Sequence, residues 1–108
     1  MSMLLPHDDN GTAVQILGFA RQATQAVVVT STSSRNSSPI RGDIEVLTII
    51  ATEACHFDVG DAAVTAEIGA SPFLYPGVYV DIPLRKGETH VAFIAAGADG
   101  TAYIMGRS

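Results

Sequence analysis

An apolar–polar alternation with a period of two residues is the feature that most constrains what this chain can fold into. The longest example covers residues 45–59, and its apolar row contains Leu47, Ile49, Ala51, Cys55 and Phe57. Residues 78–84 repeat the pattern. Successive side chains of a β-strand point to opposite faces, so each segment has one face to bury and one wetter face. Both segments are therefore predicted strands. Glu53 interrupts the first row, and we expect a bulge or a break near it.

Runs of β-branched residues predict two more strands near the start of the chain. These are residues 14–19 and 26–32, and the polar stretch 20–25 lies between them. The next segment, residues 33–39, is small and polar and ends in Pro39, so we expect an exposed loop there.

Turn residues divide the second half of the chain. We expect turns at residues 60–61, 69–72 and 85–88, and a short strand or a loop at 62–66. Pro83 cannot donate a ladder hydrogen bond, so it marks a strand end or a sheet edge. Residues 90–96 and 101–105 flank an Asp-Gly pair at Asp99 and Gly100, which predicts a β-hairpin.

About seven or eight short strands with frequent turns and no amphipathic helix are typical of a small antiparallel β-sandwich or barrel. The predicted fold class is therefore all-β. A chain of 108 residues is the size of one domain. We expect residues 1–12 to form an N-terminal arm and residues 13–108 to form a single β-sandwich domain. A chain of this length folds without metals or disulfides.

The composition excludes several classes of partner. The formal net charge is −5, and Arg85 and Lys86 are the longest basic run, so we expect no binding to nucleic acid or to an anionic membrane. The start of the chain lacks the basic and apolar regions of a signal peptide, and no apolar run reaches the roughly 18 residues of a membrane span. With 47% hydrophobic and 16% charged residues, the domain is apolar enough to hide surface in an assembly.

The residues that carry chemistry form no catalytic or metal-binding motif. His7 lies in the predicted arm, and the spacings typical of zinc ligands are absent. Cys55 and His56 are neighbours on a predicted strand and so point to opposite faces. Because Cys55 belongs to an apolar row, we interpret it as a small buried core residue. Residues 41–43 (RGD) match an adhesion tripeptide, but a turn before a strand is the better interpretation.

We therefore predict no enzymatic activity, no metal and no cofactor. An enzyme would need His56 or His90 to meet one of three aspartates in space, namely Asp58, Asp61 and Asp81.

One segment is a candidate contact surface. Phe73, Tyr75, Pro76 and Tyr79 gather three aromatic rings around a turn, and they could bind a sugar or a protein. Alternatively, Phe73 and Tyr75 could close one end of the barrel.

From Glu45 onward the order of features resembles a group of small virion proteins of tailed bacteriophages. The shared segments are 51–60 (ATEACHFDVG), 62–66 (AAVTA), 73–78 (FLYPGV), 81–84 (DIPL), 87–88 (GE) and 91–104 (VAFIAAGADGTAYI). The stretch from Glu45 onward that these segments mark out covers roughly 60 of the 108 residues, and none of the first 40 takes part.

The resemblance implies a β-sandwich subunit that decorates or cements a capsid, without catalysis. It implies a protein that is made in the host cytoplasm and located in the virion. Its partners would be copies of itself, as a homotrimer at a capsid three-fold position, and the major capsid protein or other virion proteins. Residues 1–11 could contact a neighbour by strand addition. Two alternatives stay open: a neck, tail or fibre protein, and a carbohydrate- or peptide-binding β-module.

Overall fold

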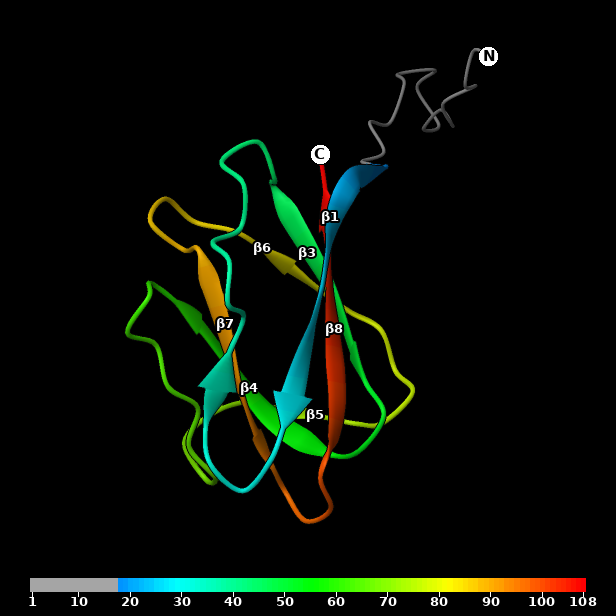
Figure 1. Cartoon of the computed structure of the whole chain (residues 1–108), viewed down its shortest axis with the longest axis vertical. Helices are drawn as coiled ribbons and strands as arrows, with labels where there is room; N and C mark the ends of the chain where they lie inside the picture. Colours follow the sequence, from blue (N-terminus) through cyan, green and yellow to red (C-terminus); the bar gives the residue numbers. More distant parts are fainter. Residues whose placement is uncertain (1–17) are drawn as a thin grey trace, which may run out of the picture.

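The computed structural model describes residues 18–108, and these form two four-stranded antiparallel sheets packed as a sandwich (Figure 1). The predicted arm at 1–12 and the start of the strand expected at 14–19 lie outside the described residues. Eight strands make up the fold: β1 Phe19–Val29, β2 Ser34–Arg35, β3 Val46–Ala51, β4 Cys55–Gly60, β5 Phe73–Leu74, β6 Val80–Pro83, β7 His90–Ala95 and β8 Gly100–Arg107. The predicted all-β sandwich class is confirmed. No helix within residues 18–108 has the length and apolarity that a membrane span requires.

We call the two sheets sheet I, which has the strand order β1-β8-β3-β6, and sheet II, which has the strand order β2-β7-β4-β5. Their inner faces meet in one apolar core, as period-two burial requires. The largest fully buried side chains in it are Phe93, Leu47, Ile49, Leu74, Ile104, Val29, Val91 and Cys55.

The break expected near Glu53 is confirmed, and it lies where the chain passes from one sheet to the other. β3 ends at Ala51 in sheet I and β4 begins at Cys55 in sheet II, so the chain crosses between the sheets at residues 52–54. The apolar row can stay in the core on both sides because each strand presents its inner face to the same interior. Pro83 is also where expected, as the last residue of the edge strand β6.

The predicted hairpin between residues 90–96 and 101–105 is wrong, although both strands exist. β7 pairs with β4 and β2 in sheet II, whereas β8 pairs with β1 and β3 in sheet I. Neither Asp99 nor Gly100 has a positive φ, so the turn that a two-residue hairpin requires does not form. Long-range pairing with β4 and β3 outweighs the local turn signal, because each strand has an apolar inner side to bury.

The start of the described chain also differs from the prediction. The polar stretch 20–25 does not separate two strands, because β1 runs without interruption from Phe19 to Val29. It contains a bulge instead. Phe19 pairs with Arg107 and Thr24 pairs with Met105, so β1 advances five residues where β8 advances two, and three residues of β1 are extra. Gln22 in this bulge has a φ of +55°, a conformation that costs a non-glycine residue about 1–2 kcal/mol.

The segment predicted as an exposed loop, residues 33–39, is partly wrong as well. Ser34 and Arg35 form the short strand β2 against β7. Asn36 is only 3% exposed, and its side-chain oxygen accepts a hydrogen bond of 2.8 Å from the N–H of Val91. Residues 62–66, left open between strand and loop, form no strand.

Candidate contact site

The predicted contact surface divides into two parts. Phe73 and Tyr75 stack edge to face with ring centroids 4.7 Å apart, and His56 packs against Phe73 at 5.3 Å. Tyr79, beyond the turn at Pro76 and Gly77, leads into β6 in sheet I and lines a shallow depression together with Thr48 and Met105. The structure thus assigns Tyr79 to a different surface from Phe73 and Tyr75.

All three aromatic rings are available to a partner. Phe73 is 42% exposed, Tyr75 67% and Tyr79 64%. These fractions do not fit the alternative in which Phe73 and Tyr75 are buried as the closed end of a barrel. An edge-to-face pair presents one ring face and one ring edge outward, which suits an apolar or a sugar contact.

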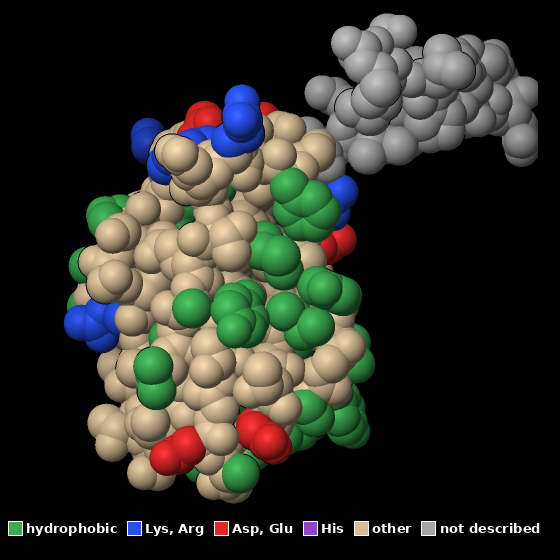
Figure 2. Space-filling view, turned by 45° about the vertical axis from the view of Figure 1, so that its right-hand side comes forward, with side chains coloured by type: hydrophobic (Ala, Val, Ile, Leu, Met, Phe, Trp, Pro, Cys, Tyr) green, Lys and Arg blue, Asp and Glu red, His purple; other side chains and the backbone are tan. Residues whose placement is uncertain are grey.

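The outer side of sheet I carries a group of apolar side chains, which we name the outer apolar face. Strand registers align Ala26 with Tyr103 and Ile50 in one row across three strands. Directly opposite residues of an antiparallel pair share a face. Figure 2, in which the right-hand side of Figure 1 comes forward, shows hydrophobic side chains gathered across this side of the molecule. The face consists of Ala26, Val28, Ile50, Tyr79, Tyr103 and Met105.

Two charged groups beside the outer apolar face, Asp81 and Arg107, are paired with each other. Asp81 accepts a hydrogen bond of 2.6 Å from the Thr48 hydroxyl and forms an ion pair of 3.4 Å with Arg107. The Arg107 guanidinium also lies over the Phe19 ring, 5.2 Å from its centroid. A partner that covers this part of the face therefore meets an ion pair and not a lone charge, which lowers the cost of desolvation.

The middle of the outer side of sheet II is covered by the chain itself. Ala92 in the middle of β7 is 0% exposed although it points away from the core, because residues 61–72 lie over it. Several hydrogen bonds hold this segment, three of them to Ser33, Arg35 and Asp58. Arg35 donates to the carbonyl of Val64 at 3.2 Å, the N–H of Ala66 donates to the Ser33 hydroxyl at 2.9 Å, and the Ser71 hydroxyl bonds to Asp58 at 3.2 Å.

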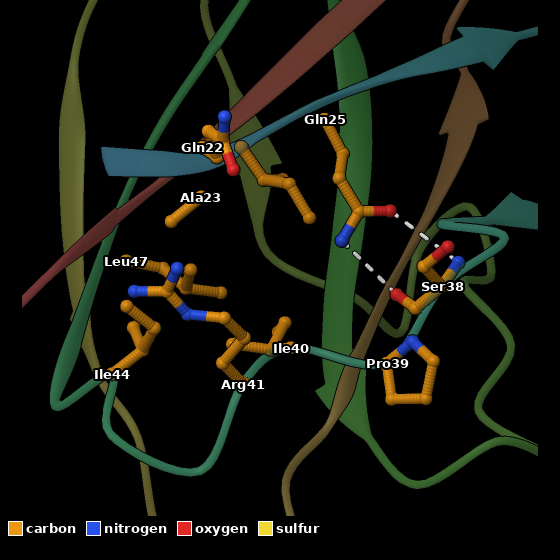
Figure 3. Close-up of a pocket in the computed structure, with 10 residues that line it drawn as sticks. Gln22, Ala23, Gln25, Ser38, Pro39, Ile40, Arg41, Ile44 and Leu47 are labelled. Carbon is orange, nitrogen blue, oxygen red and sulfur yellow. Dashed lines mark hydrogen bonds between the residues drawn. The ribbon is translucent and has the colours of Figure 1, made fainter. Parts of the chain in front are cut away.

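A cavity of about 250 Å³ opens between the β1 bulge and residues 38–44 (Figure 3). Its inner wall is apolar and belongs to the core: Ile40, Ile44, Leu47 and Ile104. Its rim is polar and neutral. Gln25 exchanges two hydrogen bonds with the backbone of Ser38, at 3.0 and 3.4 Å.

Arg41 at the rim of the cavity is fully engaged within the chain. Its guanidinium forms a two-bond pair with Asp43, each bond 3.1 Å long, and donates to the carbonyl of Arg21 at 2.8 Å. The turn interpretation of residues 41–43 fits this geometry, because the N–H of Ile44 bonds to the carbonyl of Arg41 at 3.2 Å.

The histidines and aspartates that an enzyme would need have structural partners. His56 Nδ1 lies 2.9 Å from the carbonyl of Ser71, and His90 Nδ1 lies 2.8 Å from the Thr89 hydroxyl. Asp61 accepts a hydrogen bond from the N–H of Ala63 at 2.9 Å. Within residues 18–108 no group of three or more His, Cys, Asp and Glu side chains could hold a metal ion. His7 lies outside the described residues.

Cys55 is a core residue, as predicted. It is 0% exposed, and burial raises the pKa of its thiol from the usual 9.0 to about 11. A thiolate is the nucleophilic form of cysteine, so this environment suppresses reactivity at neutral pH.

Sequence reasoning missed both the outer apolar face and the cavity. A signal for the face was present in residues 26–29 (AVVV), because an unbroken apolar run marks a strand with both faces apolar. No pattern signals the cavity, which depends on a bulge. Comparison of the chain with models of protein families, with curated proteins and with solved structures finds no match.

Proposed function

We propose that this protein is a structural subunit of a bacteriophage particle, a capsid decoration or cement protein that stabilises the head shell. The observation that supports the proposal is the outer apolar face, an uncovered sheet surface built from Val28, Tyr103, Met105 and their neighbours. The motifs that resemble small virion proteins occupy β4 and β5 together with parts of β3, β6, β7 and β8.

The energetics of a cement protein fit such a face. A protein that binds an assembled shell better than its separate subunits stabilises the shell by mass action. Burial of a large apolar side chain contributes about 1.5–3 kcal/mol, so a few residues of this face supply useful affinity. Tyrosine and methionine are enriched in protein interfaces, and both occur here.

The assembly follows from symmetry. A subunit at a capsid three-fold position forms a homotrimer, with the major capsid protein as its partner and the virion as its location. The alternative place in the particle is the neck, the tail or a fibre. Cryo-electron microscopy of the particle separates these positions by where the copies lie.

A capsid-binding measurement tests the proposal. Purified protein is added to heads of the encoding phage that lack it, and bound protein is measured by sedimentation. Val28→Asp introduces a charge into the outer apolar face and is expected to weaken binding at least about tenfold, since an unpaired buried charge costs several kcal/mol. Ile68→Asp is the matched control, because Ile68 is similarly exposed but lies in the segment over sheet II. Equal binding by both variants, or no binding by the wild type, contradicts the proposal.

A second candidate function has its own observation. The exposed Phe73–Tyr75 pair favours a carbohydrate- or peptide-binding β-module. A glycan array tests it: binding that is lost in Tyr75→Ala supports the module, and an array without signal counts against it.

A further inference from the structure

β1 has a free backbone edge beside the cavity. It lies at one end of sheet I, so only its other edge pairs, with β8. The carbonyl of Val28 accepts a bond from the Ser34 hydroxyl, and that of Thr30 accepts one of 2.8 Å from the N–H of Ala95. Even-numbered residues therefore direct their backbone groups away from β8. By the same alternation Thr24 and Ala26 present N–H and C=O groups at this edge, and nothing within residues 18–108 bonds to them there.

The cavity beside this edge is a gap in the core. Leu47 and Ile104 are each 1% exposed, yet both line an opening of about 250 Å³ that reaches the surface at Gln22 and Ala23. A dry apolar cavity of about 150 Å³ can hold a molecule as large as benzene. The opening is thus large enough for a leucine or isoleucine side chain.

We propose that an extended segment adds to the free edge of β1 and inserts an apolar side chain into this cavity, and that the segment is residues 14–17 of a second copy of the chain. Backbone hydrogen bonds from Thr24 and Ala26 and one apolar anchor are the two elements of strand addition. The proposal goes beyond a place in a virion, because it concerns how the copies join to one another.

The sequence and the position of residues 14–17 (VQIL) favour this occupant. The segment is uncharged and three of its four residues are apolar, and the rim that it must cross carries amides and an arginine neutralised by Asp43. It immediately precedes Gly18, only a few residues from Gln22 at the cavity.

The donor must be another copy. The carbonyl of Gly18 already accepts a bond of 3.1 Å from the N–H of Ser108, and Phe19 is paired with Arg107. Only Gly18 separates residues 14–17 from the paired Phe19 in the sequence, and a tight reversal needs a turn of about two residues, so this link is too short to fold back along β1 of the same chain. Donation is reciprocal in a dimer and cyclic in a trimer.

Disulfide cross-linking between two singly substituted full-length chains tests the proposal. One chain carries Ile16→Cys, and the other carries Ser38→Cys at the cavity rim, where the hydroxyl makes no hydrogen bond within the described residues. Ser31→Cys, past the far end of β1, is the matched control. The native Cys55 is buried and does not compete. We expect the Ser38→Cys pair to cross-link at least about tenfold faster than the Ser31→Cys pair, because docking raises the effective concentration.

Equal rates, or no cross-link between chains, would overturn the proposal, as would a disulfide confined within one chain that carries both substitutions. A second measurement does not depend on added cysteines: Ile16→Asp should lower the solution mass measured by light scattering, and Ile68→Asp should not. Both experiments use purified protein without phage heads. Their failure therefore leaves capsid binding untouched, and a failure of capsid binding leaves the cross-link expected.

Discussion

The outer faces of the two sheets differ in how far the rest of the chain covers them. On sheet II, residues 61–72 lie over the middle of the strands, and Ala92 there has no exposed surface. On sheet I, Val28 is 67% exposed and its neighbours Tyr103 and Met105 form part of an uncovered apolar surface. Both sheets belong to the same fold and share one core, so the fold alone does not account for the difference.

The covering segment shows how a chain of this size can protect a sheet. It is held by polar bonds to Ser33, Arg35 and Asp58, and Ala66 is buried beneath it. No described segment does the same for sheet I. A single domain gains stability by covering apolar area, so the uncovered face of sheet I is available for contacts with other molecules.

The largest expected effect concerns Asn36, which anchors the segment after β2 to β7 in sheet II. Asn36 accepts a hydrogen bond from Val91 N–H, and its amide donates to the carbonyls of Ser38 and Thr89. Asn36→Ala leaves the N–H of Val91 buried without a partner and should lower the free energy of unfolding by about 2–3 kcal/mol. Denaturant unfolding measures the loss. Ser37→Ala, at the exposed neighbouring position, should change it little, and equal effects would contradict this anchoring role.

The next effect concerns Cys55, whose buried thiol belongs to β4 in sheet II. Cys55 keeps its proton in the folded state up to about pH 11, whereas in the unfolded chain the thiol ionises near 9.0. Below pH 9 both states are protonated and the thiol adds no pH dependence. Between pH 9 and 11 the unfolded state binds fewer protons, so stability should fall by up to about 1.4 kcal/mol per pH unit.

Denaturant unfolding in steps from pH 8 to pH 11 measures this slope. Cys55→Ala removes the thiol and retains the tyrosines, so the difference between the two proteins isolates the Cys55 contribution. Parallel curves for the two proteins would show that the interior next to Cys55 is open to water.

A smaller effect tests residues 61–72, the segment that lies over sheet II. The Ser71 hydroxyl accepts a hydrogen bond of 2.9 Å from the N–H of Glu67 and bonds to Asp58. Ser71→Ala should cost about 1–2 kcal/mol, mostly as local opening of residues 61–72. Hydrogen exchange at the N–H of Ala66 should accelerate, while exchange in β8 should change little. Uniform acceleration across both sheets would mean that residues 61–72 do not open separately from the rest of the fold.

The sequence predicted what depends on local alternation. The strands β3, β4, β6, β7 and β8, the break near Glu53, the strand end at Pro83 and the burial of Cys55 each follow from a pattern within a few residues. What failed depends on contacts distant in sequence. The Asp-Gly pair at residues 99–100 indicated a hairpin, but β7 finds its partner in β4, some thirty-five residues away, by opposing Phe93 to Phe57.

The candidate site was less predictable for the same reason. Phe73, Tyr75 and Tyr79 were visible as aromatic residues near a turn, but their division between two surfaces depends on which sheet each neighbouring strand joins. The cavity needs the β1 bulge, residues 38–44 and two core strands together, and no segment encodes it alone. Asn36 looked like a loop residue because its buried partner, Val91, lies 55 residues away.

The smallest expected effect addresses the uncovered face most directly. Val28→Thr keeps the shape and β-propensity of the side chain and replaces one exposed methyl with a hydroxyl. At a surface site this should change the free energy of unfolding of the isolated protein by less than about 0.5 kcal/mol. If the face docks on a partner, the same substitution buries an extra hydroxyl and should weaken binding by about 1–3 kcal/mol. Val27→Thr, one residue away but 4% exposed in the core, should reverse the pattern by destabilising the protein itself. A clear destabilisation by Val28→Thr at a dilution where the protein is monomeric would show that something already covers this face.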